Sequence, residues 1–545
     1  MPHAAALVAE LHALIELQGG DVHTPDAVAA AAELERNGEC TLLDRLREST
    51  PEGLFELLRI PGLGPSRIRR IHQGLGIDSL QGLEAAARDG RLAALPRFGS
   101  TTAEKVLRGI AALREAGRPL LLPHARAEAA RLLAMVRAQP DVARAEIAGD
   151  VRRCREVVRE LDIVVGCREA PESVASRLAH APGVRSAIGT GSSRVAIRYD
   201  DGIVLTLHCA PERDFVVAWW RATGAEAHVA AVTAHAASLH FRITEAFTDP
   251  MGRPVPLADE AALYTTLGLQ AVPPELRERR GEIEAAVTHA LPVLVTLADL
   301  RGVLHCHSQY SDGVTTIAEM AAEAQRRGWS YLGISDHSQS AFYVGGLTGE
   351  SLARQHDEID ALNERLTGFR VLKGIEADIL PDGRVDYPVQ ATARLDYVIA
   401  SVHSRFGMNG AEMTDRVLRA LDDPQVTILG HPTGRLLLTR EAYALDMDAV
   451  LEQAGALGVA VELNADPHRL DLDWRQLRNA QRHGARIEIG PDAHSVGGLD
   501  NTALGVDMAR KGWLTAHDVL NTRDADEVLA FARARRLNAT PGARR

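Results

Sequence analysis

The sequence has little of what secreted or membrane-embedded proteins depend on. It contains five cysteines in 545 residues, without paired spacing, so we expect reduced thiols in a cytoplasmic protein. It has no stretch of about eighteen uncharged apolar residues, and therefore no membrane span is predicted. The first twenty residues have a helical pattern but carry Glu10 and lack a basic leader, which argues against a signal peptide.

An excess of basic residues is also missing. The formal net charge is −12 at pH 7, which argues against a protein that coats polyanions in general but leaves room for a local basic face. The length exceeds that of one ordinary domain, so we expect two or three domains.

What the sequence does contain is a series of short apolar strands in roughly the last 250 residues. Helix-like stretches separate most of them, which predicts a parallel barrel whose C-terminal strand ends share one mouth. The segments, each ending in a polar cluster, are 302–307, 331–337, 371–376, 397–403, 426–431, 459–464 and 487–494.

Six of these polar clusters carry a side chain that binds metals. A single histidine there is more often an ordinary surface residue, but independent surface histidines have no reason to recur at successive strand ends. Alternate residues of a strand share a face, so paired ligands such as those in His305-Cys-His307 and Asp492-Ala-His494 can reach one ion, while Cys306 points away and packs. The nine predicted ligands are His305, His307, Asp312, His337, Glu376, His403, His431, Asp492 and His494.

Nine ligands exceed what one ion needs and predict two or three divalent metals with bridging carboxylates. The mixture of imidazole and carboxylate favours Mn²⁺ or Zn²⁺, with Mg²⁺ as an alternative.

The N-terminal part, residues 1–140, reads as short helices. The segment Ile60-Pro-Gly-Leu-Gly-Pro65 resembles the hairpin of a helix-hairpin-helix DNA-binding element, in which glycines present backbone N–H groups to phosphate. An ordinary Gly-Pro turn is the alternative. A weaker second copy, Leu95 to Ser100, favours DNA, and such elements grip the backbone without reading sequence. The predicted DNA-binding residues are Gly62, Gly64, Arg67, Arg69, Arg70 and Lys105.

Between these parts the pattern mixes strands and helices. Three β-branched runs predict strands at 161–165, 195–199 and 203–208, and two helices are expected at 218–234 and 275–291.

The segment from Gly149 to Val165 resembles the nucleotidyltransferase palm of family X DNA polymerases, with an Arg-Arg pair followed by an acidic strand. Segments 215–228 and 273–286 resemble later parts of the same family. The barrel is similar to the polymerase and histidinol phosphatase (PHP) domain in motifs such as Ser335-Asp-His-Ser, Ser401-Val-His-Ser and Glu462-Leu-Asn.

The resemblance implies a multidomain α/β protein with three parts. These are a helical helix-hairpin-helix region at 1–140, a nucleotidyltransferase-like palm and thumb at 141–298, and a distorted (β/α)7 PHP barrel at 299–545.

The same resemblance implies roles in the barrel. A catalytic metal would lie between His305, His307, Glu376 and Asp492; a second would take Glu376, His403 and His431; a third would take Asp312, His337 and His494. Arg435 is the expected phosphate contact.

The palm departs from the family, which uses three aspartates to hold two metals. Here Glu160 stands first, Asp162 is intact, and Thr206 occupies the third position. The serine expected after Gly149 is Asp150, which repels a phosphate. These changes predict a degenerate palm with weak or lost polymerase activity and cast doubt on deoxynucleotide binding.

The combined prediction is a metal-dependent DNA nuclease of base-excision repair that acts on 3′ ends of gapped or nicked duplex. It would be a 3′–5′ exonuclease, with abasic-site endonuclease and 3′-phosphodiesterase as further activities. The alternatives are a gap-filling family X polymerase, a small-molecule phosphatase and a non-enzymatic DNA-binding repair scaffold.

Overall fold

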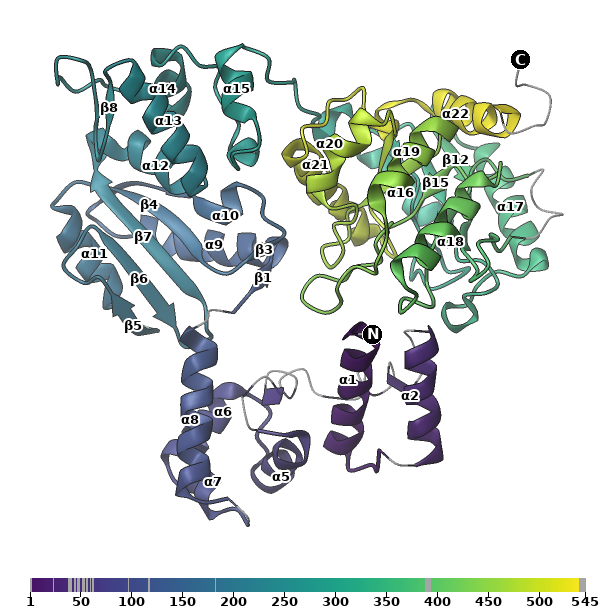
Figure 1. The fold of residues 1–545 in the computed structure, drawn as a ribbon, viewed down its shortest axis with the longest axis horizontal. Coiled ribbons are helices and arrows are strands. Elements are labelled where there is room, and N and C mark those ends of the chain that lie inside the picture. The colour runs from purple at the N-terminus through teal and green to yellow at the C-terminus, as the bar shows by residue number, and fades with distance from the viewer. Residues whose placement is uncertain are drawn as a thin grey trace. The chain divides into compact units, whose positions relative to one another are not determined.

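The computed structural model describes residues 2–538 except 23, 38–41, 44–45, 47–49, 51–53, 55–56, 59, 61–62, 97, 116–117, 182 and 388–393. The chain folds into two compact units, residues 1–291 and 292–545 (Figure 1). No helix among the described residues is both long and apolar enough to span a bilayer. The predicted cytoplasmic location stays a prediction.

The first unit begins with helices that share one apolar core, including Leu14, Ile68 and Leu83. Helix α5 starts directly after the glycine of the first predicted hairpin, with Pro65 in its first turn, and ends at Gly76, whose φ of 66° suits a residue without Cβ. The helices are α1 (Pro2–Gln18), α2 (Pro25–Asn37), α5 (Pro65–Leu75), α6 (Leu80–Arg88), α7 (Arg91–Ala94) and α8 (Ser100–Glu115).

A five-stranded sheet forms the palm, in the order β2 (Val142–Ile147), β4 (Leu161–Cys167), β7 (Val204–Pro211), β6 (Arg194–Tyr199) and β5 (Val184–Ile188). Strands β4 and β7 are parallel, and the other neighbouring pairs are antiparallel. The three predicted strands are confirmed. Strands β2 and β5 were missed because polar residues interrupt their apolar pattern. Shorter elements complete the palm: β1 (Leu120–Leu121), α9 (Leu122–Arg137), α10 (Gly149–Arg152), β3 (Val157–Val158) and α11 (Pro171–Ala179).

In the thumb-like segment, neither predicted helix is continuous, so both predictions are corrected. The first is two helices that meet at Gly224, α12 (Phe215–Thr223) and α13 (Glu226–Ser238). The second is a single turn at Pro274–Leu276 followed by the short α15 (Glu282–Val287). The side chain of Glu282 accepts from the amides of Arg279 and Arg280, which bends the chain where a continuous helix was expected. The remaining elements are β8 (Arg242–Ile243), β9 (Phe247–Thr248) and α14 (Glu260–Thr266).

The second unit is the predicted distorted parallel barrel. Its strands follow chain order in two sheet segments, β10-β11-β12 and β13-β14-β15-β16-β17. There are two segments because the third predicted strand is split at residues 374–375. Bridges from His337 to Glu376 and from Cys306 to Ala493 join the segments at both seams. The strands are β10 (Gly302–Val303), β11 (Tyr331–Ile334), β12 (Arg370–Lys373), β13 (Glu376–Asp378), β14 (Ile399–Ser401), β15 (Ile428–Leu429), β16 (Ala460–Asn464) and β17 (Ile487–Gly490).

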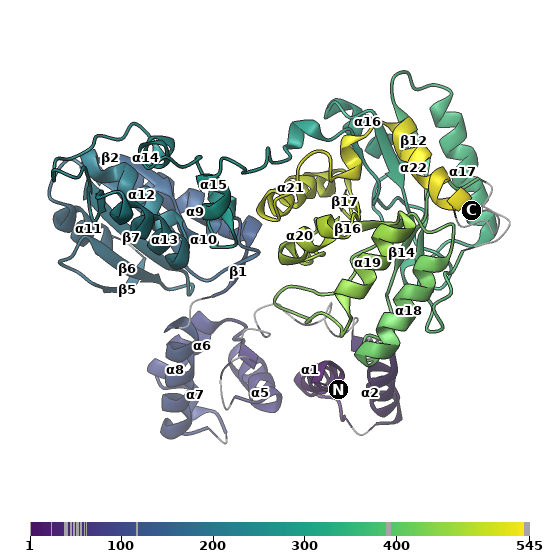
Figure 2. The ribbon, with the colours of Figure 1, turned by 45° about the horizontal axis from the view of Figure 1, so that its top comes forward.

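Helices pack around this barrel (Figure 2). They are α16 (Ile317–Arg326), α17 (Gly349–Asn363), α18 (Gly410–Asp422), α19 (Met447–Leu457), α20 (Trp474–Arg482), α21 (Thr502–Lys511) and α22 (Ala525–Asn538). Cys306 is buried in the apolar cluster that includes Val303 and Met320, as predicted for a residue that turns away from the mouth.

Candidate functional site

All nine predicted ligands meet where the barrel strands end. Three overlapping groups form: His305, His307 and Asp492; His337, Glu376 and His403; and His307, Asp312, His337 and His494. His431 joins them, with Nε2 3.0 Å from a Glu376 oxygen. His307 and His337 are each shared between two of these groups, whereas the predicted division shared Glu376 between two of its three ligand sets. That division stays a prediction.

The deep part of the site is centred on Glu376. One of its carboxylate oxygens lies 3.4 Å from His305 Nε2 and 3.6 Å from His307 Nε2, and the other lies 3.2 Å from His403 Nε2. Asp492 Oδ1 approaches His305 and His307 from the opposite seam, at 3.5 and 3.2 Å. A carboxylate with imidazoles on both oxygens has the geometry of a bridging ligand.

The outer part of the site is more exposed. Asp312 Oδ2 lies 3.2 Å from His494 Nε2 and 3.6 Å from His337 Nε2. The His494 ring stacks on that of His307, with centroids 4.3 Å apart, and so connects the outer and deep parts.

Several buried imidazole nitrogens face this cluster without a hydrogen-bond partner. They include His305 Nε2 and both ring nitrogens of His307. A buried polar atom without a partner costs free energy, and a metal ion in the cluster would satisfy those that face it. The donor set therefore fits divalent metals.

The protonation of the cluster reflects competing effects. Burial lowers the pKa of His307 to about 4 and that of His431 to about 3, which leaves these imidazoles neutral. Burial also opposes charge on His494, but Asp312 and Asp492 raise its pKa to about 9. Burial alone would raise the pKa of Glu376, but the surrounding histidines hold it well below its usual range.

Two carboxylates whose role the sequence did not reveal orient the ligand histidines. Glu462, on β16, accepts from His305 Nδ1 at 2.6 Å and from the backbone N–H of His431. Asp378, on β13, accepts from His403 Nδ1 at 2.7 Å. Each contact keeps Nδ1–H as a donor and fixes the ring orientation, so that Nε2 is the atom that a metal would bind. Gly490 makes room, because a Cβ there would overlap Glu462.

A third buried carboxylate, Asp336, holds the loop that carries Asp312. It accepts from the Ser308 N–H at 2.8 Å, from the Ser308 hydroxyl at 2.6 Å and from Gln355 at 2.5 Å. The Ser335-Asp-His-Ser motif contained this residue, but nothing in the sequence separated its role from that of His337.

The predicted phosphate contact, Arg435, has protein partners in the structure, and its contact with phosphate stays a prediction. The Arg435 guanidinium donates to the carbonyls of Arg469 and Leu470 and pairs with Asp473 at 2.6 Å, so it secures that loop. Arg469 is the cation beside the cluster, with Nε 3.6 Å from Asp492 Oδ2. It is the better candidate for attracting a phosphate.

In the palm, the strand register places Thr206 directly beside Asp162. The Thr206 hydroxyl donates to Glu160, and His208 Nε2 lies 2.8 Å from Asp162 Oδ1. A hydroxyl thus stands where the resemblance predicts a third carboxylate, and Glu160 and Asp162 each have a side-chain partner. Gly149, with φ of 58°, is required because a Cβ there would overlap the Asp162 carboxylate.

The paired arginines that follow are also engaged. Arg152 binds Glu260 through two hydrogen bonds of 2.8 and 2.6 Å and lies 3.5 Å above the ring of Trp219. Arg153 contacts Asp150 and donates to Glu278 at 3.1 Å. Asp150 therefore pairs with an arginine of the palm, and its carboxylate also places a negative charge there.

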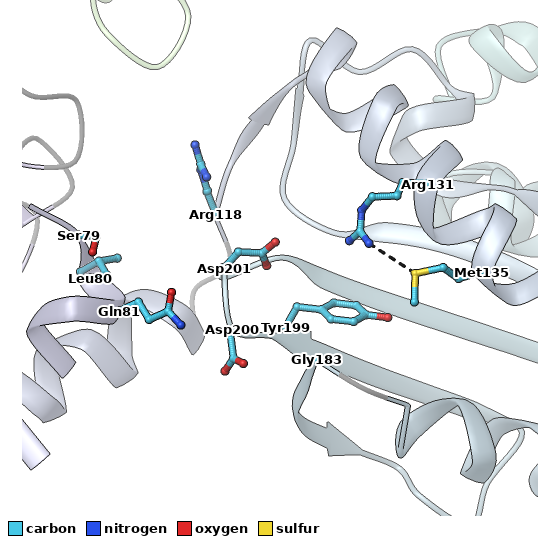
Figure 3. A pocket seen from close by; sticks show the side chains of 10 residues that line it. All are labelled: Ser79, Leu80, Gln81, Arg118, Arg131, Met135, Gly183, Tyr199, Asp200 and Asp201. Atoms are coloured by element: carbon cyan, nitrogen blue, oxygen red, sulfur yellow. Dashed lines mark hydrogen bonds between the residues drawn. The ribbon is translucent and has the colours of Figure 1, made fainter. Parts of the chain in front are cut away.

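A cavity of about 1,150 Å³ opens beside these residues, and its lining includes Asp162, Arg194, His208 and Arg221. A smaller hollow of about 400 Å³ lies elsewhere in the first unit, and its lining includes Arg118, Arg131, Asp200 and Asp201 (Figure 3). Its mixed charges favour no anion, and we assign it no function.

The predicted DNA-binding residues fall on two helix starts. Gly64 caps α5, and Arg67 and Lys105 are exposed on α5 and α8. Arg70 is half-buried, and Arg69 lies 3.5 Å from the Glu16 carbonyl, so it packs against α1 instead of standing free. Gly62 lies outside the described residues. DNA contact by the individual residues stays a prediction.

Family models match three parts of the chain: a SAM-like helix-hairpin-helix tandem at 54–112, a DNA polymerase beta thumb at 218–278 and a PHP domain at 304–465. The protein named DNA polymerase/3′-5′ exonuclease PolX of Bacillus subtilis strain 168 is 36% identical over 504 residues, which cover 91% of this chain and 87% of that protein. The chain belongs to the family X DNA polymerases that carry a C-terminal PHP domain.

Two weaker similarities accompany the family X assignment. A probable phosphatase of Caldanaerobacter subterraneus subsp. tengcongensis is 29% identical over 208 residues, 36% of this chain and 77% of its own length. A crystal structure of Leishmania infantum polymerase beta covers 42% of this chain and 98% of that one, at 13% identity and a TM-score of 0.27, too low to support an argument. Family X membership implies DNA as a partner and a phosphoesterase domain in the barrel.

Proposed function

We propose that this family X protein is a metal-dependent DNA 3′-end-processing nuclease of base-excision repair whose polymerase activity is weak or lost. The observation that carries the proposal is the contrast between nine convergent ligands in the barrel and the threonine in the palm acid cluster. The printed name of the Bacillus subtilis relative, which joins a polymerase to a 3′–5′ exonuclease, supports it.

Two or three divalent ions, Mn²⁺ or Zn²⁺ with Mg²⁺ as the alternative, would be held by the nine barrel ligands, with His305, His307, Glu376 and Asp492 as the catalytic set. Such ions acidify water and neutralise charge on a phosphodiester. The protein itself supplies neutral imidazoles at His307 and His431 and two orienting carboxylates, Glu462 and Asp378. Arg469 attracts the phosphate to the mouth.

The first unit serves as a DNA-holding platform in this proposal. Helix starts at α5 and α8 bind backbone phosphate without reading sequence. We assign the helix-hairpin-helix region to 1–140, the palm and thumb to 141–298 and the nuclease to 299–545. The substrates are 3′ ends of gapped or nicked duplex, with abasic-site cleavage and 3′-phosphodiesterase activity as further reactions.

A labelled gapped duplex tests the proposal when it is incubated with Mn²⁺, with and without deoxynucleotides. We expect the primer to shorten from its 3′ end in both cases. Lengthening with nucleotides would instead support the gap-filling polymerase, which the intact Asp162 and the adjacent cavity favour. DNA binding without either change would support a repair scaffold.

A further inference from the structure

Three large apolar side chains are exposed in loops that follow barrel strands. Within the described part of 302–531 these are Val314, Phe342 and Leu438, with 69%, 80% and 53% of their surface exposed. Each follows a strand that carries ligands: Val314 follows β10, Phe342 follows β11 and Leu438 follows β15. Exposed apolar side chains also occur at Val293 and Leu297, before β10, and at Leu537 on α22. The three loop side chains differ from these because they follow strands whose ends supply metal ligands.

Two of these side chains border the outer ligands. The Val314 N–H donates to the carbonyl of His494 at 2.8 Å. The turn that begins at Phe342 packs against Ser311, since a Cβ at Gly345 would lie 3.4 Å from the Ser311 carbonyl oxygen. Ser311 precedes Asp312, so Val314 and Phe342 lie on segments in contact with the outer ligands Asp312 and His494, where a substrate enters.

The third side chain is held in a strained conformation. Leu438 has a φ of 66°, at the tip of a turn closed by two hydrogen bonds between Leu436 and Arg440, of 2.8 and 2.7 Å. Glycine or asparagine adopts this conformation more readily than leucine does. A strained, exposed leucine is therefore retained at a cost to the fold, which indicates that its side chain has a use.

We propose that Val314, Phe342 and Leu438 form an apolar rim that receives the nucleobases of the DNA strand whose phosphate enters the metal centre. This inference rests on the proposed nuclease function and adds specificity-determining residues to it. Phosphates and sugars are polar, so the base faces are the part of a DNA strand that an apolar surface retains. Aromatic rings stack on bases of any sequence, and aliphatic side chains wedge between base steps. The rim therefore favours base-bearing strands over equally charged phosphodiesters.

Two 5′-labelled single-stranded oligonucleotides test this on the full-length protein with Mn²⁺. They are identical except that one carries a tetrahydrofuran abasic analogue at its last two 3′ positions. We expect Phe342→Ala to lower kcat/KM about tenfold on the base-bearing strand and to leave the abasic strand unchanged. Leu537→Ala, also at a 69% exposed residue but on α22, is the matched control and should leave both unchanged.

Leu438→Gly adds an independent readout. It should relieve strain and preserve or raise the Tm, while it slows cleavage of the base-bearing strand alone. A lower Tm together with lower activity in Leu438→Gly would show that this residue serves the fold. Equal slowing of cleavage on both strands in Phe342→Ala would show that Phe342 serves the fold or the metals. Either result would contradict the proposed rim. Full activity of Phe342→Ala on both strands would do the same. A wild-type protein inert on both strands would instead contradict the nuclease function itself.

Discussion

The barrel mouth and the palm both gather acidic side chains, but they differ in whether their polar groups have protein partners. In the barrel, buried nitrogens of His305 and His307 lack protein partners and point at Asp492 and Glu376. In the palm, several charged groups have a partner from within the site: His208 contacts Asp162, and Glu260 binds Arg152. A site kept for a ligand tolerates unsatisfied groups, whereas a site that has lost its ligand gains stability by pairing them.

The largest effect expected from this contrast is loss of cleavage after one barrel ligand is removed. His305→Ala or Glu376→Ala should lower 3′-end removal at least about a thousandfold, because several kcal/mol of electrostatic stabilisation disappear. A labelled-primer assay measures this, with DNA affinity expected to persist.

His483→Ala is the matched control for these variants, because His483 pairs with Asp448 on the barrel exterior. It should cleave at the wild-type rate. Undiminished cleavage by the His305 and Glu376 variants would place the active site outside the barrel.

The next effect concerns repair of the palm. In a His305→Ala background, primer extension should be very slow or absent, since Thr206 supplies a hydroxyl where a carboxylate ligand is required. Thr206→Asp alone should recover little. Adding Glu160→Asp and Asp150→Ser should recover at least about tenfold more, because the latter also frees Arg153 from its internal partner.

Changes of the same type on the palm surface, Glu146→Asp and Asp200→Ser, should recover nothing and control for altered charge. Efficient template-directed extension by the otherwise unaltered His305→Ala chain would erase the contrast between the two sites and identify a working polymerase.

A smaller effect should follow from the residues behind the barrel ligands. Glu462→Gln cannot accept from both His305 Nδ1 and the His431 amide, so Mn²⁺ affinity should fall about 10- to 100-fold in calorimetric titrations. Glu488→Gln is the control, because burial and the nearby Glu462 raise the pKa of Glu488 to about 8, and glutamine resembles its neutral form. Equal losses in both variants would indicate damage to the fold.

The sequence predicted most where metal-binding residues recur at the ends of regularly spaced strands. Ligands at successive strand ends disclosed the barrel and its mouth, because parallel strands deliver their C-terminal ends to one place. The motif Glu462-Leu-Asn was recognised, but the orienting role of Glu462 was not, because its partner His305 lies 157 positions away and the sequence gives no sign of that contact.

The palm and thumb were less predictable for a related reason. The turn at 279–282 depends on side-chain-to-backbone hydrogen bonds from a single glutamate, which periodicity does not register. Arg435 looked like a phosphate ligand by residue type, but only three-dimensional contacts with Asp473 and two carbonyls show that its donors are engaged.

The smallest expected effect is the pH dependence of metal binding. The pKa of His494 is raised to about 9 and those of His305 and His403 also lie above the usual value, so these rings hold protons in the metal-free chain at neutral pH. A metal must displace those protons, so affinity should rise with pH, and the proton on His494 alone should make it fall about tenfold per pH unit below about 9. Asp492 and Glu376, whose pKa values are depressed, stay ionised and add no competing proton.

Calorimetry of Mn²⁺ binding in buffers of different ionisation enthalpy measures the protons released. His494→Gln should release fewer protons than wild type, whereas His208→Gln in the palm should not change the number. Equal proton release in wild type and His494→Gln would show that His494 is no metal ligand.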